Sequence, residues 1–173
     1  MLTRIRQFWF AIFSKMGSED IQFVQSHLTL EEQSLFFQMD RPTQTHCLRV
    51  ANTCLKLLGY NSGLDQKILI KAALLHDIGK PANLITTIDR VLIVLLGALT
   101  RKPIEDLLKV LKGRGRFSKV LSAHAMHPQK GAVMARNFGL PQEIINLIEK
   151  HHQPIQSADP SELAILKKAD ELN

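Results

Sequence analysis

The sequence lacks the features that mark secreted and membrane-spanning proteins. Its only two cysteines, Cys47 and Cys54, fall on one expected helix, where their Cα atoms would lie about 10 Å apart, too far for a disulfide. The absence of a disulfide framework fits a reducing compartment, so we expect a cytoplasmic protein. The longest apolar run, residues 91–99, is about half the roughly 20 residues that a transmembrane helix needs.

Aromatic residues are also scarce, with one tryptophan and one tyrosine among 173 residues. Strand-like alternation is absent, whereas the helical spacing of apolar residues recurs along the chain. Thr29 followed by Glu32 predicts a helix that opens with a capping box. These patterns predict an all-α bundle of roughly eight helices joined by short loops, within residues 2–16, 30–39, 46–58, 65–76, 91–99, 103–111, 128–138, 141–152 and 161–172.

We expect two parts: a helical extension of residues 1–40, packed on a domain of residues 41–173. Apolar side chains within residues 2–16 form an amphipathic stripe. Such a stripe favours packing on the domain. Peripheral contact of residues 1–16 with a membrane surface is the alternative. The stripe consists of Leu2, Ile5, Trp9, Ile12, Phe13 and Met16.

The formal net charge of +6 favours an anionic partner, but it does not choose between a nucleotide, a nucleic acid and a lipid headgroup. Residues 112–119 form the densest basic segment. They could contact phosphate groups or simply be solvated, so nucleic acid stays open as a partner without being indicated. The segment lacks the Gly-Lys-Ser/Thr ending of a P-loop, which argues against a nucleoside-triphosphate motor.

The most informative motif is His76-Asp77-Ile78-Gly79, followed by Lys80, at the end of an apolar helical run. Imidazole and carboxylate together suit a divalent metal. Adjacent residues inside a straight helix point about 100° apart, so the pair needs to stand at a helix end to reach one site. Its carboxylate has two oxygens, which makes Asp77 the natural ligand to share between two metals.

Other polar residues on expected inward helix faces could converge on this pair. His46 and Asp170 would complete a first metal site with His76 and Asp77. Three further histidines would form a second with the shared Asp77, and a two-metal site of this kind activates water and clamps phosphate oxygens. His124 is an alternative to His127, but the His-Pro-x-x-Gly context favours His127. The second set comprises His127, His151 and His152.

These motifs, in the order in which they occur along the chain, resemble the HD superfamily of metal-dependent phosphohydrolases. Its HDIG branch is the most similar. The resemblance runs from about His46 to Asp170. It implies a helical HD-domain fold and one or two divalent transition metals per chain, with Fe, Mn, Zn, Co and Ni not distinguished. It also implies that Asp77 is central to catalysis and that Lys80 holds a phosphate, whereas a helix-capping cation is the simpler interpretation of Lys80. The subgroup that cleaves cyclic di-GMP carries a Gly-Tyr-Pro element, and this element is missing after His152. Its absence argues against a cyclic dinucleotide as the substrate.

The sequence therefore predicts a phosphohydrolase that acts on a phosphate ester of a nucleotide or related metabolite through a mono- or binuclear His/Asp site. A phosphorylated small molecule or nucleotide is the expected partner. Two alternatives use the same ligands: a di-iron oxygenase, and a non-catalytic signalling module that senses a metal or a nucleotide.

Overall fold

A computed structural model describes residues 16–59, 63–80 and 115–173, and all regular structure within these ranges is helical. The expected all-α fold is confirmed. The expected helices at 91–99 and 103–111, most of the helix at 2–16 and residues 112–114 of the basic segment lie outside the described residues. The described helices are α2 (Ser18–His27), α3 (Leu30–Gln38), α4 (Arg41–Leu58), α5 (Gln66–Leu75), α8 (Gly115–Asn137), α9 (Gln142–Lys150) and α10 (Ser161–Leu172).

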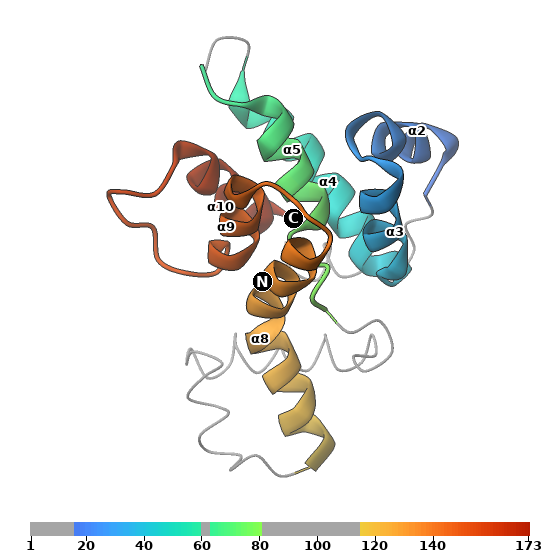
Figure 1. Ribbon diagram of the computed structural model, residues 1–173, viewed down its shortest axis with the longest axis vertical. Coiled ribbons are helices and arrows are strands. Elements are labelled where there is room, and N and C mark those ends of the chain that lie inside the picture. The colour runs from blue at the N-terminus through green and yellow to red at the C-terminus, as the bar shows by residue number, and fades with distance from the viewer. Residues whose placement is uncertain (1–15, 60–62, 81–114) are drawn as a thin grey trace.

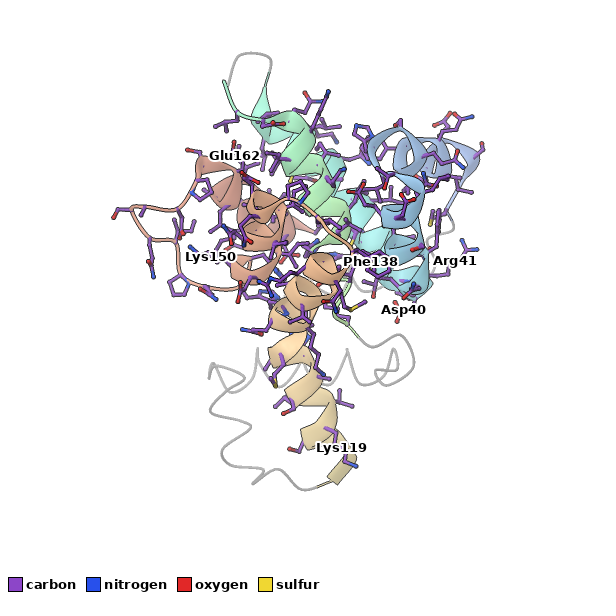
Figure 2. All side chains as sticks on the ribbon, in the orientation of Figure 1. Asp40, Arg41, Lys119, Phe138, Lys150 and Glu162 are labelled. Carbon is purple, nitrogen blue, oxygen red and sulfur yellow. The ribbon has the colours of Figure 1, made fainter. Side chains whose placement is uncertain are left out.

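Helices α4 and α5 form the centre of the fold (Figure 1). Helices α9 and α10 lie on one side of this pair, and α2 and α3 lie on the other. Helix α8 begins away from the centre, with Lys119 near that end, and runs toward the centre (Figure 2). It also contacts α9. Within the described ranges, no helix combines the length and the apolar character that crossing a membrane would require.

Helix α4 begins at Arg41, five residues before the expected start at His46. The carboxylate of Asp40 accepts a hydrogen bond from the backbone N–H of Thr43 at 2.9 Å, and Pro42 occupies the first turn. Both features favour a helix start. The helix ends at Gly59, whose positive φ of 65° is a conformation that glycine adopts readily, as the sequence predicts.

Helix α5 follows the expected bounds closely. The side chain of Asp65 accepts from the backbone N–H groups of Lys67 and Ile68 at its start, and His76 is the residue at its C-terminal end. Most of the helix is apolar and fully buried, which fits its central place. The His76-Asp77 pair therefore stands at a helix end, where two adjacent side chains can both point toward one site.

Helix α8 contradicts the expected helix at 128–138. It starts at Gly115 and passes through Pro128, which therefore lies in its interior. The expectation was wrong because proline usually ends or begins a helix: it lacks an N–H and its ring clashes with the preceding turn.

The first two described helices pack on α5. The capping box of Thr29 and Glu32 at the start of α3 is present, as expected. Helix α2 was not expected, because Val24 is its single buried residue and its apolar pattern is weak. Apolar side chains of both helices, such as Val24 of α2 and Leu35 of α3, belong to the same core cluster as those of α4 and α5.

Candidate metal centre

Five helices bring the predicted ligands to one place. His46 comes from the second turn of α4, His76 and Asp77 from the end of α5, and His127 from α8. His151 stands at the end of α9, whose apolar face is buried. Asp170 follows the buried residues Leu163, Leu166 and Ala169 on α10. The residues are far apart in sequence, so the packing of the bundle alone gathers them.

The carboxylate of Asp77 lies at the centre of this group and is 1% exposed. Its Oδ2 lies 3.5 Å from Nε2 of His76 and 3.8 Å from Nε2 of His46. Its Oδ1 lies 3.0 Å from Nε2 of His127 and 3.9 Å from Nε2 of His151. The two oxygens of one side chain thus face two different pairs of histidines.

The Oδ2 side also includes Asp170. Its Oδ1 accepts a hydrogen bond from Nε2 of His46 at 2.9 Å and lies 3.7 Å from Nε2 of His76. For a metal held at about 2.1 Å by each ligand, neighbouring ligand atoms lie about 3.0 to 3.4 Å apart. The separations among His46, His76, Asp77 and Asp170 are close to that range, so small side-chain movements would seat one cation.

The Oδ1 side contains two histidine nitrogens in direct contact. Nε2 of His127 and Nε2 of His151 lie 3.2 Å apart. The ligand atoms of His127, His151 and His152 all lie within 4.8 Å of one another. His152 is the outermost of the three, because its side chain is exposed while the other two are buried.

Three of the histidines are anchored in the same way. Nδ1 donates to the backbone carbonyl three residues earlier: His76 to Ala73 at 2.9 Å, His127 to His124 at 2.5 Å, and His151 to Ile148 at 2.6 Å. A carbonyl can only accept, so the hydrogen must be on Nδ1. In the neutral ring, the lone pair on Nε2 then points into the centre. This is the tautomer that a metal ligand needs.

The centre also contains buried atoms without hydrogen bonds. Among the described residues, Nε2 of His76 and Oδ1 of Asp77 are the buried side-chain atoms that have no hydrogen-bond partner. Nε2 of His127 is close to Oδ1 of Asp77 but not aligned for a hydrogen bond. Buried polar atoms are nearly always paired, because leaving them unpaired costs about 1 to 3 kcal/mol each. A cation bound between them would satisfy both, so the donor set fits a metal.

The ionised state of the two carboxyl groups favours cation binding. Burial alone would raise the pKa of Asp77, but the positive charges of Lys80 and His76 outweigh it and hold that pKa well below its usual range. For Asp170, burial likewise raises the pKa, and the hydrogen bond from His46 more than offsets it. Both carboxyl groups are therefore ionised near neutral pH, the form that binds metals.

The histidines divide into two groups. Burial lowers the pKa of His46 and of His151. These rings are thus neutral near pH 7. Burial also acts to lower the pKa of His76, but the negative charge of Asp77 raises it more, and the net pKa lies well above the usual value. A metal at His76 would displace a proton.

Lys80 reaches back to the centre instead of extending into solvent. Its Nζ donates to Oδ2 of Asp77 at 2.5 Å, and its side chain is 20% exposed. The lysine therefore neutralises Asp77 at the edge of the group. It is close to the first set of ligands and still reachable by solvent.

Two further residues lie beside the centre. Sγ of Cys47 lies 3.8 Å from Nδ1 of His76, whose Nε2 is the nitrogen near Asp77. The ring of His124 lies 5.4 Å from that of His127 and 6.3 Å from that of His152, measured between centroids. His124, which the sequence offered as the alternative to His127, stands one helical turn before it and lies beside the centre.

A close backbone approach joins the two sets of ligands. A Cβ atom built on Gly79 would clash with the carbonyl oxygen of His127 and lie 2.5 Å from the backbone nitrogen of Gly131. A Cβ on Gly131 would lie 3.3 Å from the nitrogen of Gly79 and 3.1 Å from Cγ2 of Ile148. The glycines of the His-Asp-Ile-Gly and His-Pro-x-x-Gly motifs thus let α8 meet the end of α5, so that His127 reaches Asp77.

Comparison with known proteins gives one family. The family model described as the HD domain matches residues 43–173. The match covers every residue of the centre and begins just after the start of α4. No curated protein and no solved structure matches the chain.

Proposed function

The chain belongs to the HD domain family, and we propose that it is a metal-dependent phosphohydrolase of the HDIG branch. The proposed substrate is a phosphate ester of a nucleotide or a related metabolite. The reaction adds water to phosphorus and breaks the P–O bond to the leaving alcohol. The products are that alcohol and a phosphate that carries the oxygen of the water.

The observation that carries this proposal is the division of the Asp77 carboxylate. Each of its oxygens faces its own set of histidine nitrogens, and one of them is buried without a hydrogen bond. A shared carboxylate between two ligand sets is the arrangement that a binuclear hydrolytic centre uses. We propose His46, His76, Asp77 and Asp170 as ligands of one divalent transition metal, and His127, His151, His152 and Asp77 as ligands of a second.

Bound divalent metals supply Lewis-acid chemistry, which activates water and offsets negative charge on phosphate oxygens. The protein's own contribution is orientation. The carbonyls of Ala73, His124 and Ile148 fix the rings of three histidines, so that no ring has to turn during the reaction.

We assign Lys80 the role of holding the substrate phosphate. In the metal-free protein its ammonium group neutralises Asp77. A metal at Asp77 would replace that charge, and the lysine could then turn to a phosphate oxygen without leaving a buried carboxylate uncompensated. Its partial exposure gives it access to a bound substrate.

We further propose that residues 1–40 form an extension that is part of the same folded unit as residues 41–173. The apolar side chains of α2 and α3 in the common core support this. A phosphorylated small molecule or nucleotide is the proposed partner, and the cytoplasm is the proposed location.

Hydrolysis of synthetic esters tests the proposal. The purified chain is stripped of metal, reloaded separately with Mn²⁺, Fe²⁺, Co²⁺, Ni²⁺ or Zn²⁺, and assayed with p-nitrophenyl phosphate, bis-p-nitrophenyl phosphate and nucleoside monophosphates. We expect turnover with at least one metal. Asp77→Ala should abolish it, and His27→Ala, which removes a histidine outside the centre, should not.

Other results would point to other functions. Oxygen consumption by the Fe²⁺ form without phosphate release would indicate a di-iron oxygenase. Stoichiometric nucleotide binding without turnover with any metal would indicate a sensing module. Either result would overturn the proposed hydrolysis while leaving the metal centre intact.

A further inference from the structure

Pro128 lies immediately after His127 in the interior of α8 and is buried. In a regular helix, the backbone N–H of residue 128 would donate to the carbonyl of His124, four residues earlier. Proline has no N–H, so this donation cannot occur. The carbonyl of His124 therefore lacks its usual helical partner.

That same carbonyl accepts the hydrogen bond from Nδ1 of His127, at 2.5 Å. The other two anchored histidines, His76 and His151, stand at the C-terminal ends of α5 and α9. The last four carbonyls of a helix have no intrahelical donor, so a histidine at the end can use one of them without competition. His127 is ten residues before Asn137, the last residue of its helix. At this interior position, the carbonyl three residues earlier would normally be occupied by a backbone N–H.

We propose that Pro128 is a positioning residue for His127. By removing one backbone donor in mid-helix, it frees the carbonyl of His124 to hold the imidazole with its hydrogen on Nδ1. The inference rests on the proposed metal centre, because the benefit of this tautomer is a lone pair on Nε2.

The surroundings of Nε2 show why the tautomer matters. Nε2 of His127 lies 3.2 Å from Nε2 of His151 and 3.0 Å from Oδ1 of Asp77. In the other tautomer, a hydrogen on Nε2 would point into the space between these atoms, where a cation would have to bind. Anchoring Nδ1 keeps that space open for a metal.

The proposal predicts opposite effects on stability and on metal binding for Pro128→Ala. Alanine is far more favourable than proline in a helix interior, so the melting temperature of the metal-free variant should stay equal or rise. The restored N–H competes with His127 for the carbonyl of His124, so binding of the second metal should weaken by about 10- to 100-fold. This is the range seen when a metal-ligating histidine loses the group that accepts its other ring hydrogen. Binding of the first metal should not change.

The direct readout is the tautomer of His127 in metal-free protein, measured from its ¹⁵N chemical shifts. We expect the Nδ1–H form in the wild type and a mixture of tautomers in Pro128→Ala. Pro160→Ala, which changes the proline that precedes α10, is the matched control and should behave as the wild type.

A backbone ester at position 128, made by placing lactic acid there, removes the N–H without a proline ring. It should restore the wild-type tautomer and the affinity for the second metal. An unchanged tautomer in Pro128→Ala, or an ester that does not rescue it, would overturn the role of Pro128. If the wild type binds no metal, the proposed function fails, but the tautomer measurement still decides this inference.

Discussion

Nε2 of His127 lies 3.0 Å from Oδ1 of Asp77, and this contact connects α8 to the end of α5. The other oxygen of the same carboxylate lies among His46, His76 and Lys80. A single side chain thus links two sets of ligands that come from different helices. The predictions below follow from this link and from the packing that maintains it.

Gly79→Ala should separate the two sets of ligands. Its new methyl group would clash with the carbonyl of His127, so α8 must move away from α5. We expect a loss of about 3 kcal/mol in the free energy of unfolding, at the upper end for overpacking, together with weaker binding of the second metal. Urea unfolding and metal titration measure the two effects.

Gly131→Ala provides a graded comparison, because its nearest contacts at 3.1 and 3.3 Å are less severe. We expect a loss of about 1 kcal/mol and a smaller effect on metal binding. Gly17→Ala, with its nearest atom at 3.9 Å, should leave metal binding unchanged. If Gly79→Ala and Gly17→Ala bind metal alike, the close backbone approach does not position His127.

Lys80→Ala should lower activity without removing metal. If the ammonium group holds the phosphate, its loss should reduce kcat/KM for a phosphate ester by roughly 100- to 1,000-fold, the range for losing one charge-stabilising donor. The metal-free variant should also melt at a lower temperature, because Asp77 loses the cation that neutralises it. Metal addition should recover most of that stability.

Lys80→Arg controls for charge and should retain part of the activity. Loss of metal from Lys80→Ala, measured by elemental analysis, would contradict a phosphate role and make Lys80 a support for the ligands instead.

Glu32 and Lys71 should hold the N-terminal helices to α5. Their side chains form an ion pair at 2.7 Å, in which Glu32 is 8% exposed and Lys71 21%. Glu32 also accepts from the backbone N–H of Thr29. Glu32→Ala removes both interactions, and we expect a loss of about 2 to 3 kcal/mol in the free energy of unfolding, somewhat below the range for fully buried pairs.

Glu32→Gln can keep the capping hydrogen bond and should lose less, and Glu31→Ala, at a neighbouring exposed position, should lose little. Urea unfolding of the full chain should show one transition. Two separate transitions would contradict the proposal that residues 1–40 belong to the same folded unit.

Cys54 should lower the free energy of unfolding as the pH becomes alkaline. Burial raises the pKa of its thiol to about 12, whereas an unfolded cysteine titrates near about 8.5. The folded state therefore favours the neutral thiol, so its contribution is complete below about pH 8.5 and is lost progressively as pH rises toward 12. Between pH 7 and pH 10, Cys54→Ala should lose less stability than the wild type. Rapid reaction of the native Cys54 thiol with a thiol reagent at pH 8 would contradict its burial.

Much of the fold followed from local signals. The cap at Thr29 and the glycine at Gly59 marked helix ends correctly, because each acts on the backbone locally. Helix α8 could not be predicted in the same way. A proline such as Pro128 is usually excluded from a helix interior. The hydrogen bond from His127 to the carbonyl of His124 is visible only in three dimensions.

The centre shows a similar division. Helical periodicity indicated which side chains face inward, and the position of Asp77 at a helix end suggested a shared carboxylate. The sequence could not indicate that Cys47 lies behind His76 or that Gly79 abuts His127, because these contacts depend on how separate helices cross. The sequence also could not indicate that His152 is exposed while His127 and His151 are buried.

The metal content of the freshly purified protein tests the central claim most directly. We expect about two transition-metal ions per chain by elemental analysis. Asp77→Ala should lose both, because each oxygen of Asp77 serves one set of ligands, whereas His27→Ala should retain both. Retention of stoichiometric metal by Asp77→Ala would contradict the assignment of Asp77 as the shared ligand.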